Sequence, residues 1–241
     1  MSRTIAYHRP STLEEAVGLL ESAGEAPRVI LGGGTIVNTG SARQEVVDLQ
    51  ALDLSRIDDE GGSVVIGAMT TLQAVADNAS VPQGIRDAAK AEQPSTLRTV
   101  STIGGTVGER SGESRLLATL LAFGCEVSSA SSAGPDQSSL ESWLSTGLGI
   151  ITAITVETGG SSATAATGRT PADVPIVAAV AHSGVGGVSL ALTGVAETPV
   201  LVDTDNPTGG LEPPADFRGS AEYRLSVAAT LSTRVLAEVQ S

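Results

Sequence analysis

Apolar positions along the N-terminal part of the chain alternate between helical spacing and short runs of strand length. In the segment RPSTLEEAVGLLESAGE, the apolar residues from Leu13 to Leu20 recur three or four positions apart, so they share one helix face. A serine or threonine precedes them as a helix cap. The pattern predicts one helix, followed by short strands at 28–31 and 45–49, and hence a small β/α lobe.

A second unit begins after Asp53 and again alternates strands with helices. A proline that follows Gln93 ends one of these helices, because proline disfavours helical geometry in the residue before it. The predicted elements are a strand at 63–67, a helix opened by Thr70 or Thr71, a helix at 84–92, a buried helix at 114–124 that Gly124 closes, and a strand at 125–130.

The C-terminal third opens with a change in composition. Residues 159–168 are mostly Gly, Ser, Ala and Thr, which predicts a long flexible turn or a lobe boundary. Beyond it, PIVAAVAH indicates a helix or a strand, GGVSLALTGV indicates a strand, and 203–217 a loop. The last segment is amphipathic and predicts a long helix, with Tyr223, Val227, Leu231 and Val235 along one face.

Composition limits how the core can be built. Apolar residues make up 41% of the 241 residues but aromatic residues only 2%, so Val, Leu, Ile and Ala must fill the core of a compact, multi-lobed protein. We interpret the sole tryptophan, Trp143, as core packing. The single cysteine, Cys125, excludes an internal disulfide or a four-cysteine cluster within this sequence, and we interpret it as a small buried residue.

Charge and targeting signals narrow the function classes. A formal net charge of −13 argues against a nucleic-acid surface, because binding a polyanion requires Lys and Arg to neutralise phosphates. The first ten residues hold no apolar core of signal-peptide length, and no run approaches the ~20 apolar residues that a membrane span needs. We therefore expect a cytoplasmic protein without a transmembrane segment.

Candidate catalytic side chains are few. His8 and His182 lie far apart in the sequence, with no serine elbow or metal-ligand spacing around either. We expect no catalytic side chain and no metal site in this chain. Any reaction would then belong to a cofactor that the protein binds and orients.

Two glycine stretches follow apolar runs, in VILGGGTIV at 29–37 and in TVSTIGGTVG at 99–108. An ordered glycine costs roughly 0.5–1 kcal/mol in backbone freedom. Successive backbone amides without Cβ atoms can close around an anion such as the pyrophosphate of a dinucleotide, and we expect the two stretches to face each other as loops. Each could also be a tight turn without a ligand. Neither has the spacing of a nucleotide-triphosphate loop or of a Rossmann fingerprint.

The order of several motifs carries a family resemblance over nearly the whole chain. YHRPSTLEEAVGLL, LGGGTIVN, VVDLQALDLSRI, VVIGAMTTLQAV, LRTVSTIGGTVG, LLATLLAFGCEV and FRGSAEYRLSVAATL together resemble the FAD-binding medium subunit of molybdenum hydroxylases. That family includes the xanthine dehydrogenase and carbon monoxide dehydrogenase flavoproteins. The resemblance implies an α+β fold: a two-lobed FAD-binding domain of the PCMH type (lobes 1–54 and 55–158), followed by a C-terminal α+β lobe with an antiparallel sheet (159–241).

The same resemblance implies the residues of an FAD site. The loops that match the family's pyrophosphate cradle comprise Leu31, Gly32, Gly33, Gly34 and Thr35, and then Thr102, Gly104 and Gly105. Val29, Ile30 and Ile36 would line the cofactor beside the first loop, and Ser101, Thr106 and Ser114 around the second. Ile150 or Ile151 would face the isoalloxazine ring.

The sequence departs from the family pattern near the second loop. Thr106 replaces the usual Asn, Glu109 and Arg110 stand where small residues are common, and Arg115 replaces an Asp. In the C-terminal lobe Ala165 occupies the position of a common lysine, and Arg169 is the only basic residue nearby.

The resemblance also implies a function and partners. FAD would lie in this chain, and a molybdopterin-type cofactor and [2Fe-2S] clusters in a large and a small partner subunit, assembled as a dimer of heterotrimers. Electrons would pass from the clusters to FAD and on to an external acceptor. The alternative is a flavin-free structural or docking subunit of the same type of complex.

Overall fold

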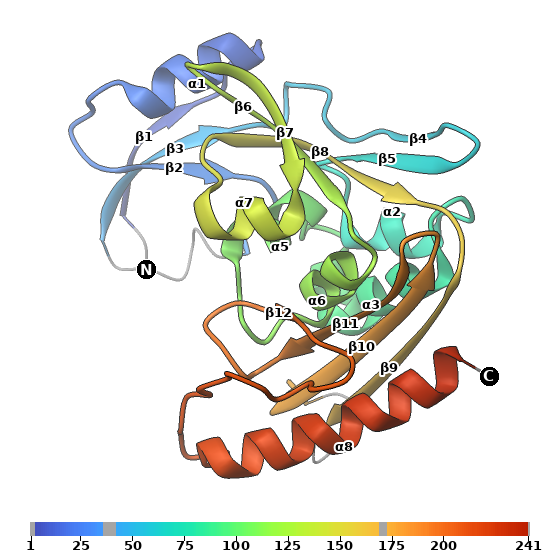
Figure 1. Cartoon of the computed structure of the whole chain (residues 1–241). Helices are drawn as coiled ribbons and strands as arrows, with labels where there is room; N and C mark the ends of the chain where they lie inside the picture. The colour runs from blue at the N-terminus through green and yellow to red at the C-terminus, as the bar shows by residue number, and fades with distance from the viewer. Residues whose placement is uncertain (1–2, 36–41, 169–172, 241) are drawn as a thin grey trace.

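The computed structural model describes residues 3–35, 42–168 and 173–240, which form three sheets with helices packed around them (Figure 1). The fold is of the mixed α+β class, as predicted. The three sheets fall in the three successive ranges assigned to lobes. That division stays a prediction, because the core around the central helices also includes Val180 and Ala191 of the third sheet.

The first sheet is parallel. It has the order β1-β3-β2, with β1 at Arg3–His8, β2 at Arg28–Leu31 and β3 at Arg43–Asp48. Helix α1 (Leu13–Glu21) packs on it and begins where Thr12 Oγ1 accepts a hydrogen bond from the Glu15 amide at 3.2 Å. This helix and both predicted strands are confirmed.

A buried carboxylate ties α1 to this sheet. Glu45 accepts from Arg28 Nε at 2.7 Å and lies 3.2 Å from His8 Nε2, while Arg28 Nη1 donates to the Leu19 carbonyl at the end of α1. The Arg28 guanidinium, with help from the Glu25 amide and His8, lowers the pKa of Glu45 to about 2. His8 therefore serves the structure of this lobe.

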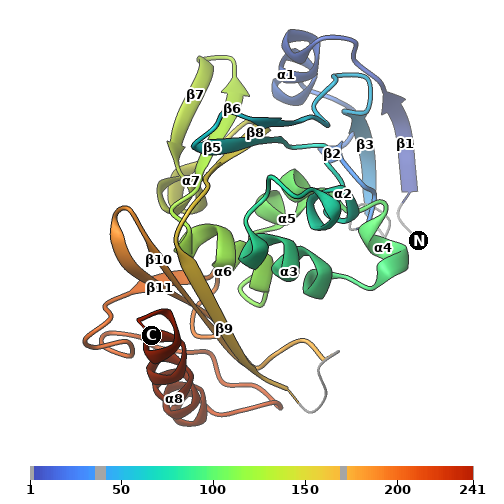
Figure 2. The same ribbon diagram turned by 90° about the vertical axis from the view of Figure 1, so that its right-hand side faces the viewer.

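The second sheet is antiparallel, and its order β4-β5-β8-β6-β7 places β8 between β6 and the much earlier strand β5. Helices lie beneath one face of it (Figure 2). The strands are β4 (Ile57–Asp59), β5 (Ser63–Gly67), β6 (Glu126–Ser131), β7 (Gly134–Ser139) and β8 (Ile150–Glu157). The helices are α2 (Leu72–Asp77), α3 (Gln83–Glu92), α4 (Ser95–Arg98), α5 (Ile103–Glu109), α6 (Arg115–Ala122) and α7 (Leu140–Thr146).

The second glycine stretch is not a loop, which corrects the sequence-based expectation. Gly104 and Gly105 form the first turn of α5, and Thr102 is its N-cap. A Cβ atom on Gly104 would lie 2.6 Å from the Ala68 Cβ, so glycine is needed there for the close packing of the helix on the strand end.

The C-terminal sheet is antiparallel as predicted, with the order β12-β11-β10-β9. Its strands are β9 (Ser161–Thr167), β10 (Val177–Gly184), β11 (Gly187–Thr193) and β12 (Val200–Val202). Helix α8 (Ala221–Val239) packs on one face, and α6 lies toward the other (Figures 1 and 2).

The prediction of a flexible turn at 159–168 is wrong, because most of this segment forms strand β9. Its Ser, Ala and Thr residues alternate between exposure and burial, with Ala163 and Ala165 in the core. Only the preceding glycines make a turn, with Gly160 at φ +78°.

The terminal helix buries a different stripe from the predicted one at its first turn. Leu231 and Val235 are buried as expected, but Tyr223 is exposed and Arg224 is buried in its place. Arg224 tolerates burial because its guanidinium donates to the Ile176 and Gly194 carbonyls and pairs with Asp216 at 2.8 Å.

Candidate functional site

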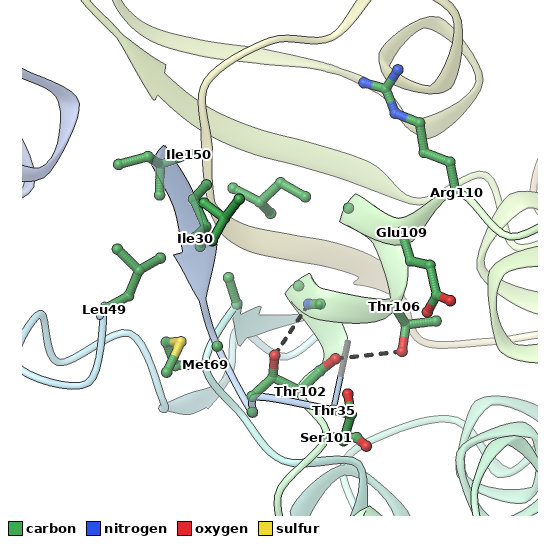
Figure 3. Close-up of a pocket in the computed structure, with 18 of the residues that line it drawn as sticks. Ile30, Thr35, Leu49, Met69, Ser101, Thr102, Thr106, Glu109, Arg110 and Ile150 are labelled. Carbon is green, nitrogen blue, oxygen red and sulfur yellow. Dashed lines mark hydrogen bonds between the residues drawn. The ribbon is translucent and has the colours of Figure 1, made fainter. Parts of the chain in front are cut away.

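A cavity of about 730 Å³ lies between the end of β2, helix α5 and the start of β8 (Figure 3). The described residues that line it come mainly from four separate stretches of the chain, within 29–35, 68–69, 101–110 and 143–151, with Gln44, Leu49 and Gln93 added. Its size is typical of a small-molecule or cofactor site.

The two glycine stretches meet at this cavity, as predicted. A Cβ atom on Gly33 would lie 1.8 Å from the Val100 carbonyl oxygen, and one on Gly32 would lie 2.9 Å from Thr102 Oγ1. Gly34 has φ +75°, a left-handed conformation that favours glycine. The first glycine stretch is therefore bare because it packs backbone to backbone against the segment that leads into α5.

The backbone amides of the two glycine stretches differ in whether they have an acceptor among the described residues. Gly104 donates to the Ala68 carbonyl at 2.9 Å and Gly105 to Thr102 Oγ1 at 3.1 Å. The expectation that amides of both stretches point at one anion is therefore wrong for the second stretch. In the first, the amides of Gly32, Gly33 and Thr35 donate to no acceptor among the described residues.

Hydroxyl groups gather at the end of the cavity where the two glycine stretches meet (Figure 3). Thr106 Oγ1 donates to the Thr102 carbonyl at 3.4 Å, so its hydrogen-bonding capacity is partly used. Ser101 is only 6% exposed, and its Oγ has no hydrogen-bond partner within the described part of the chain. A buried hydroxyl without a partner is costly unless a ligand satisfies it.

The other end of the cavity is apolar. Figure 3 shows Ile30, Leu49 and Ile150 grouped to one side of α5, away from Ser101 and Thr106, with Met69 closer to Thr102. Ile151 and Leu148 continue this wall along the start of β8. The cavity thus combines a polar end built from donors with an apolar end of aliphatic side chains.

Two charged residues line the cavity near the end of α5. Burial raises the pKa of the Glu109 carboxyl above its ordinary value. The Arg110 guanidinium lies 4.4 Å from the centroid of the Trp143 ring, and its Nη2 donates to the Gly147 carbonyl at 2.5 Å. Arg110 is therefore directed at the wall and leaves the interior open.

Most of the residues implied by the family resemblance line this cavity. They are Val29, Ile30, Gly32, Gly33, Gly34, Thr35, Ser101, Thr102, Gly104, Gly105, Thr106 and Ile150, with the alternative Ile151. Ile36 lies outside the described residues, and so does Arg169. Their roles as cofactor ligands stay predictions.

Two of the expected residues do not line the cavity. Leu31 is the last residue of β2, and its carbonyl accepts from the Leu49 amide. Ser114 caps α6, where its Oγ accepts from the Leu117 amide at 3.0 Å. Arg115 follows it and donates to the Ala91 carbonyl, also away from the cavity.

Sequence reasoning missed the wall formed by Trp143, Gly147 and Leu148. Trp143 is buried as expected, yet it also lines the cavity. The signal available was the pair of glycines around Leu148, directly before the predicted ring-facing isoleucines. The described residues contain no helix apolar and long enough to cross a membrane and no cluster of metal-ligating side chains.

Comparison with known proteins gives a consistent result. The family model described as "FAD binding domain in molybdopterin dehydrogenase" matches residues 3–154. The uncharacterized protein YgfM of Escherichia coli K12 is 29% identical over 252 residues, covering 97% of this chain and 96% of that protein. The carbon monoxide dehydrogenase medium chain of Afipia carboxidovorans is 37% identical over 108 residues, which are 41% of this chain and 37% of that one.

Solved structures share the fold over the full length. A chain of carbon monoxide dehydrogenase from Hydrogenophaga pseudoflava gives a TM-score of 0.88 at 22% identity, covering 100% of this chain and 98% of that one. A chain of quinoline 2-oxidoreductase from Pseudomonas putida 86 gives 0.83 at 21% identity, covering 97% and 96%. Because the family model spans well over half of the sequence, the chain belongs to the family of FAD-binding domains of molybdopterin dehydrogenases.

Proposed function

We propose that this chain is the FAD-binding electron-transfer subunit of a heteromeric molybdenum hydroxylase. In this role it receives electrons from [2Fe-2S] clusters of a partner subunit and passes them to an external acceptor. FAD supplies that redox chemistry when it is bound. The observation that carries the proposal is the buried Ser101 hydroxyl, which has no partner among the described residues and lies beside the open amides of the first glycine stretch.

These donors fit a diphosphate. The amides of Gly32, Gly33 and Thr35 and the Ser101 hydroxyl can all donate to anionic oxygens, and charge-assisted hydrogen bonds of this kind are stronger than neutral ones. Backbone donors also explain how a chain of net charge −13 could hold an anion without a lysine. The apolar wall at Ile30 and Ile150 suits a flat aromatic ring.

The flavin-free docking alternative depends on crowding of the second stretch. Glu109 and Arg110 stand where small residues are common in the family. The Arg110 side chain packs on the Trp143 ring, so it does not fill the cavity. Arg115 lies outside the cavity. The open volume of about 730 Å³ therefore favours retained flavin over a purely structural role.

The partners belong to the same proposal. A molybdenum-binding large subunit and a [2Fe-2S] small subunit would supply the substrate site and the electrons, in a dimer of heterotrimers. Family membership and the medium-chain relative support this arrangement. Flavin content in the purified complex tests it: flavin in equal stoichiometry is expected, and substoichiometric flavin would favour the docking alternative.

The diphosphate site is tested by titrating the full chain with FAD, riboflavin and ADP. FAD should bind, ADP should compete with it, and riboflavin should bind far more weakly because it lacks the phosphates. Ser101→Ala should weaken FAD binding by about tenfold, the effect of losing a hydrogen bond to a charged group.

Ser232→Ala is the matched control. Ser232 is also a buried serine whose Oγ has no described partner, but it lies in α8, remote from the cavity lining. Both variants should keep the stability of the flavin-free protein, since neither hydroxyl makes a hydrogen bond there. Equal FAD affinity in the two variants would contradict the site.

A further inference from the structure

Arg110 adopts a backbone conformation that a side chain of this kind rarely takes. It is the C-cap of α5 with φ +53° and ψ +30°, and Asp53 is the only other non-glycine residue with positive φ among those described. Glycine or asparagine usually fills such a position. A long cationic side chain is present here at a conformational cost, which points to a task for the side chain.

The contacts of Arg110 join two helices and the segment that follows them. Its guanidinium covers the Trp143 ring at 4.4 Å, and its Nη2 donates to the Gly147 carbonyl at 2.5 Å. Gly147 is the C-cap of α7, and its own amide donates to the Trp143 carbonyl at 2.8 Å. Arg110 thus connects the end of α5 to the end of α7.

The segment 147–149 is fixed by its two glycines. A Cβ atom on Gly147 would lie 2.4 Å from Trp143 Cδ1, and one on Gly149 (φ +94°) would lie 2.4 Å from the Ala130 carbonyl oxygen. Between them, Leu148 lines the cavity although the residue is 82% exposed. A large apolar side chain is therefore held at the rim of an apolar wall with little protein to cover it.

We propose that Leu148 covers the ring of bound flavin at the apolar end of the cavity, and that Arg110 is a positioning residue that holds Leu148 there through Trp143 and the Gly147 carbonyl. This inference rests on the proposed function. Figure 3 shows the Arg110 side chain directed away from Ser101 and Thr35, so Arg110 acts on the wall and not on the polar end.

The test compares flavin dissociation from full-length variants. Arg110→Gly is the sharpest change, because glycine keeps the left-handed conformation without strain while the guanidinium is lost. Arg110→Gly and Leu148→Ala should each speed flavin dissociation by about tenfold, and the double variant should be no faster than Leu148→Ala. Arg110→Lys, which keeps the charge, should restore part of the slow dissociation.

Arg115→Ala is the control, because Arg115 also donates to a backbone carbonyl but lies away from the cavity. Two spectroscopic signals separate positioning from general stability. Iodide should quench bound flavin more strongly in Arg110→Gly than in the wild type, and emission from Trp143, the only tryptophan, should shift in the flavin-free variant.

The outcomes distinguish the two proposals. Wild-type protein that binds no flavin would overturn the proposed function and this inference together. Normal flavin binding with unchanged dissociation and iodide access in Arg110→Gly would overturn only the role of Arg110. Acceleration equal to that in Arg115→Ala would also contradict the positioning role, since it would indicate a general effect of lost charge.

Discussion

The two glycine stretches look alike in the sequence but differ in how their backbone amides are used. In the first, the glycines allow a close approach to Val100 and Thr102, and the amides of Gly32 and Gly33 donate to nothing described. In the second, Gly104 and Gly105 lie in a helical turn whose amides are already paired. A run of glycines therefore does not by itself make an anion site. The acceptors around the amides decide it.

The largest effect is expected where the two stretches touch. Gly33→Ala would place a Cβ atom 1.8 Å from the Val100 carbonyl oxygen, so one of the two segments must move. We expect a loss of about 3 kcal/mol in the free energy of unfolding, together with loss of FAD binding. Denaturant unfolding of the flavin-free protein measures the first effect, and fluorescence titration the second.

Gly105→Ala is the control for this prediction. Its Cβ would meet only Thr102 Oγ1, at 3.0 Å, within a helix where alanine is favoured. Its stability should change by less than about 1 kcal/mol. Equal losses of unfolding free energy in Gly33→Ala and Gly105→Ala would show that the two glycine stretches do not differ in their backbone contacts.

The second-largest effect is expected from a substitution that fills the cavity without a steric clash. A side chain at Gly108 would meet Ile151 Cδ1 only at 3.9 Å, so Gly108→Leu should fit on α5 and occupy the cavity. FAD affinity should fall by about tenfold or more, while stability rises by up to about 1 kcal/mol because leucine is a better helix former.

Gly18→Leu provides the comparison, because Gly18 lies in α1 with no atom near its Cβ position and away from the cavity. It should gain similar stability and keep full FAD affinity. If Gly108→Leu binds FAD as well as Gly18→Leu does, the cavity is not the flavin site.

The smallest effect is expected from a substitution that frees a backbone amide in the second glycine stretch, which then resembles the first. Thr102→Ala removes the cap of α5 and Ser114→Ala the cap of α6, each at a cost of about 1 kcal/mol in thermal unfolding. Only Thr102→Ala frees an amide, that of Gly105, at the cavity wall. Added FAD should therefore raise the melting temperature more in Thr102→Ala than in Ser114→Ala, and an equal rise would contradict this account.

Sequence patterns predicted the elements whose signals are local. The cap before Leu13, the buried helix predicted at 114–124 and the strand at 63–67 all carry strong spacing or capping signals. The structure confirms these elements, although the helix ends at Ala122 with Phe123 as its C-cap, and Gly124 follows at φ +67°. The same reasoning failed for β9 and α5, because their small residues give no clear alternation of apolar and polar positions. Burial of Ala163 is set by tertiary packing, and the local cap at Thr102 was overlooked because the glycines after it were interpreted as a loop.

The candidate site was predictable only in part, because its walls come from distant segments. The two glycine stretches were found from the sequence pattern, and Ser101 through the family resemblance. The wall at Trp143 and Leu148 depends on how α7 and β8 pack against α5, which no local pattern records. Ser114 shows the converse error, since a motif position can serve a helix cap in place of a ligand.

The position of β8 has a consequence for how the protein acquires its shape. This strand pairs with β5 on one side and β6 on the other, so the middle of the second sheet is completed by residues 150–157. During synthesis, the first 149 residues supply both glycine stretches and the apolar residues Ile30, Leu49 and Met69, but not Ile150 and Ile151 at the start of β8. A nascent chain shorter than this would hold an incomplete cavity, so under the proposed function FAD would bind only after β8 has emerged from the ribosome.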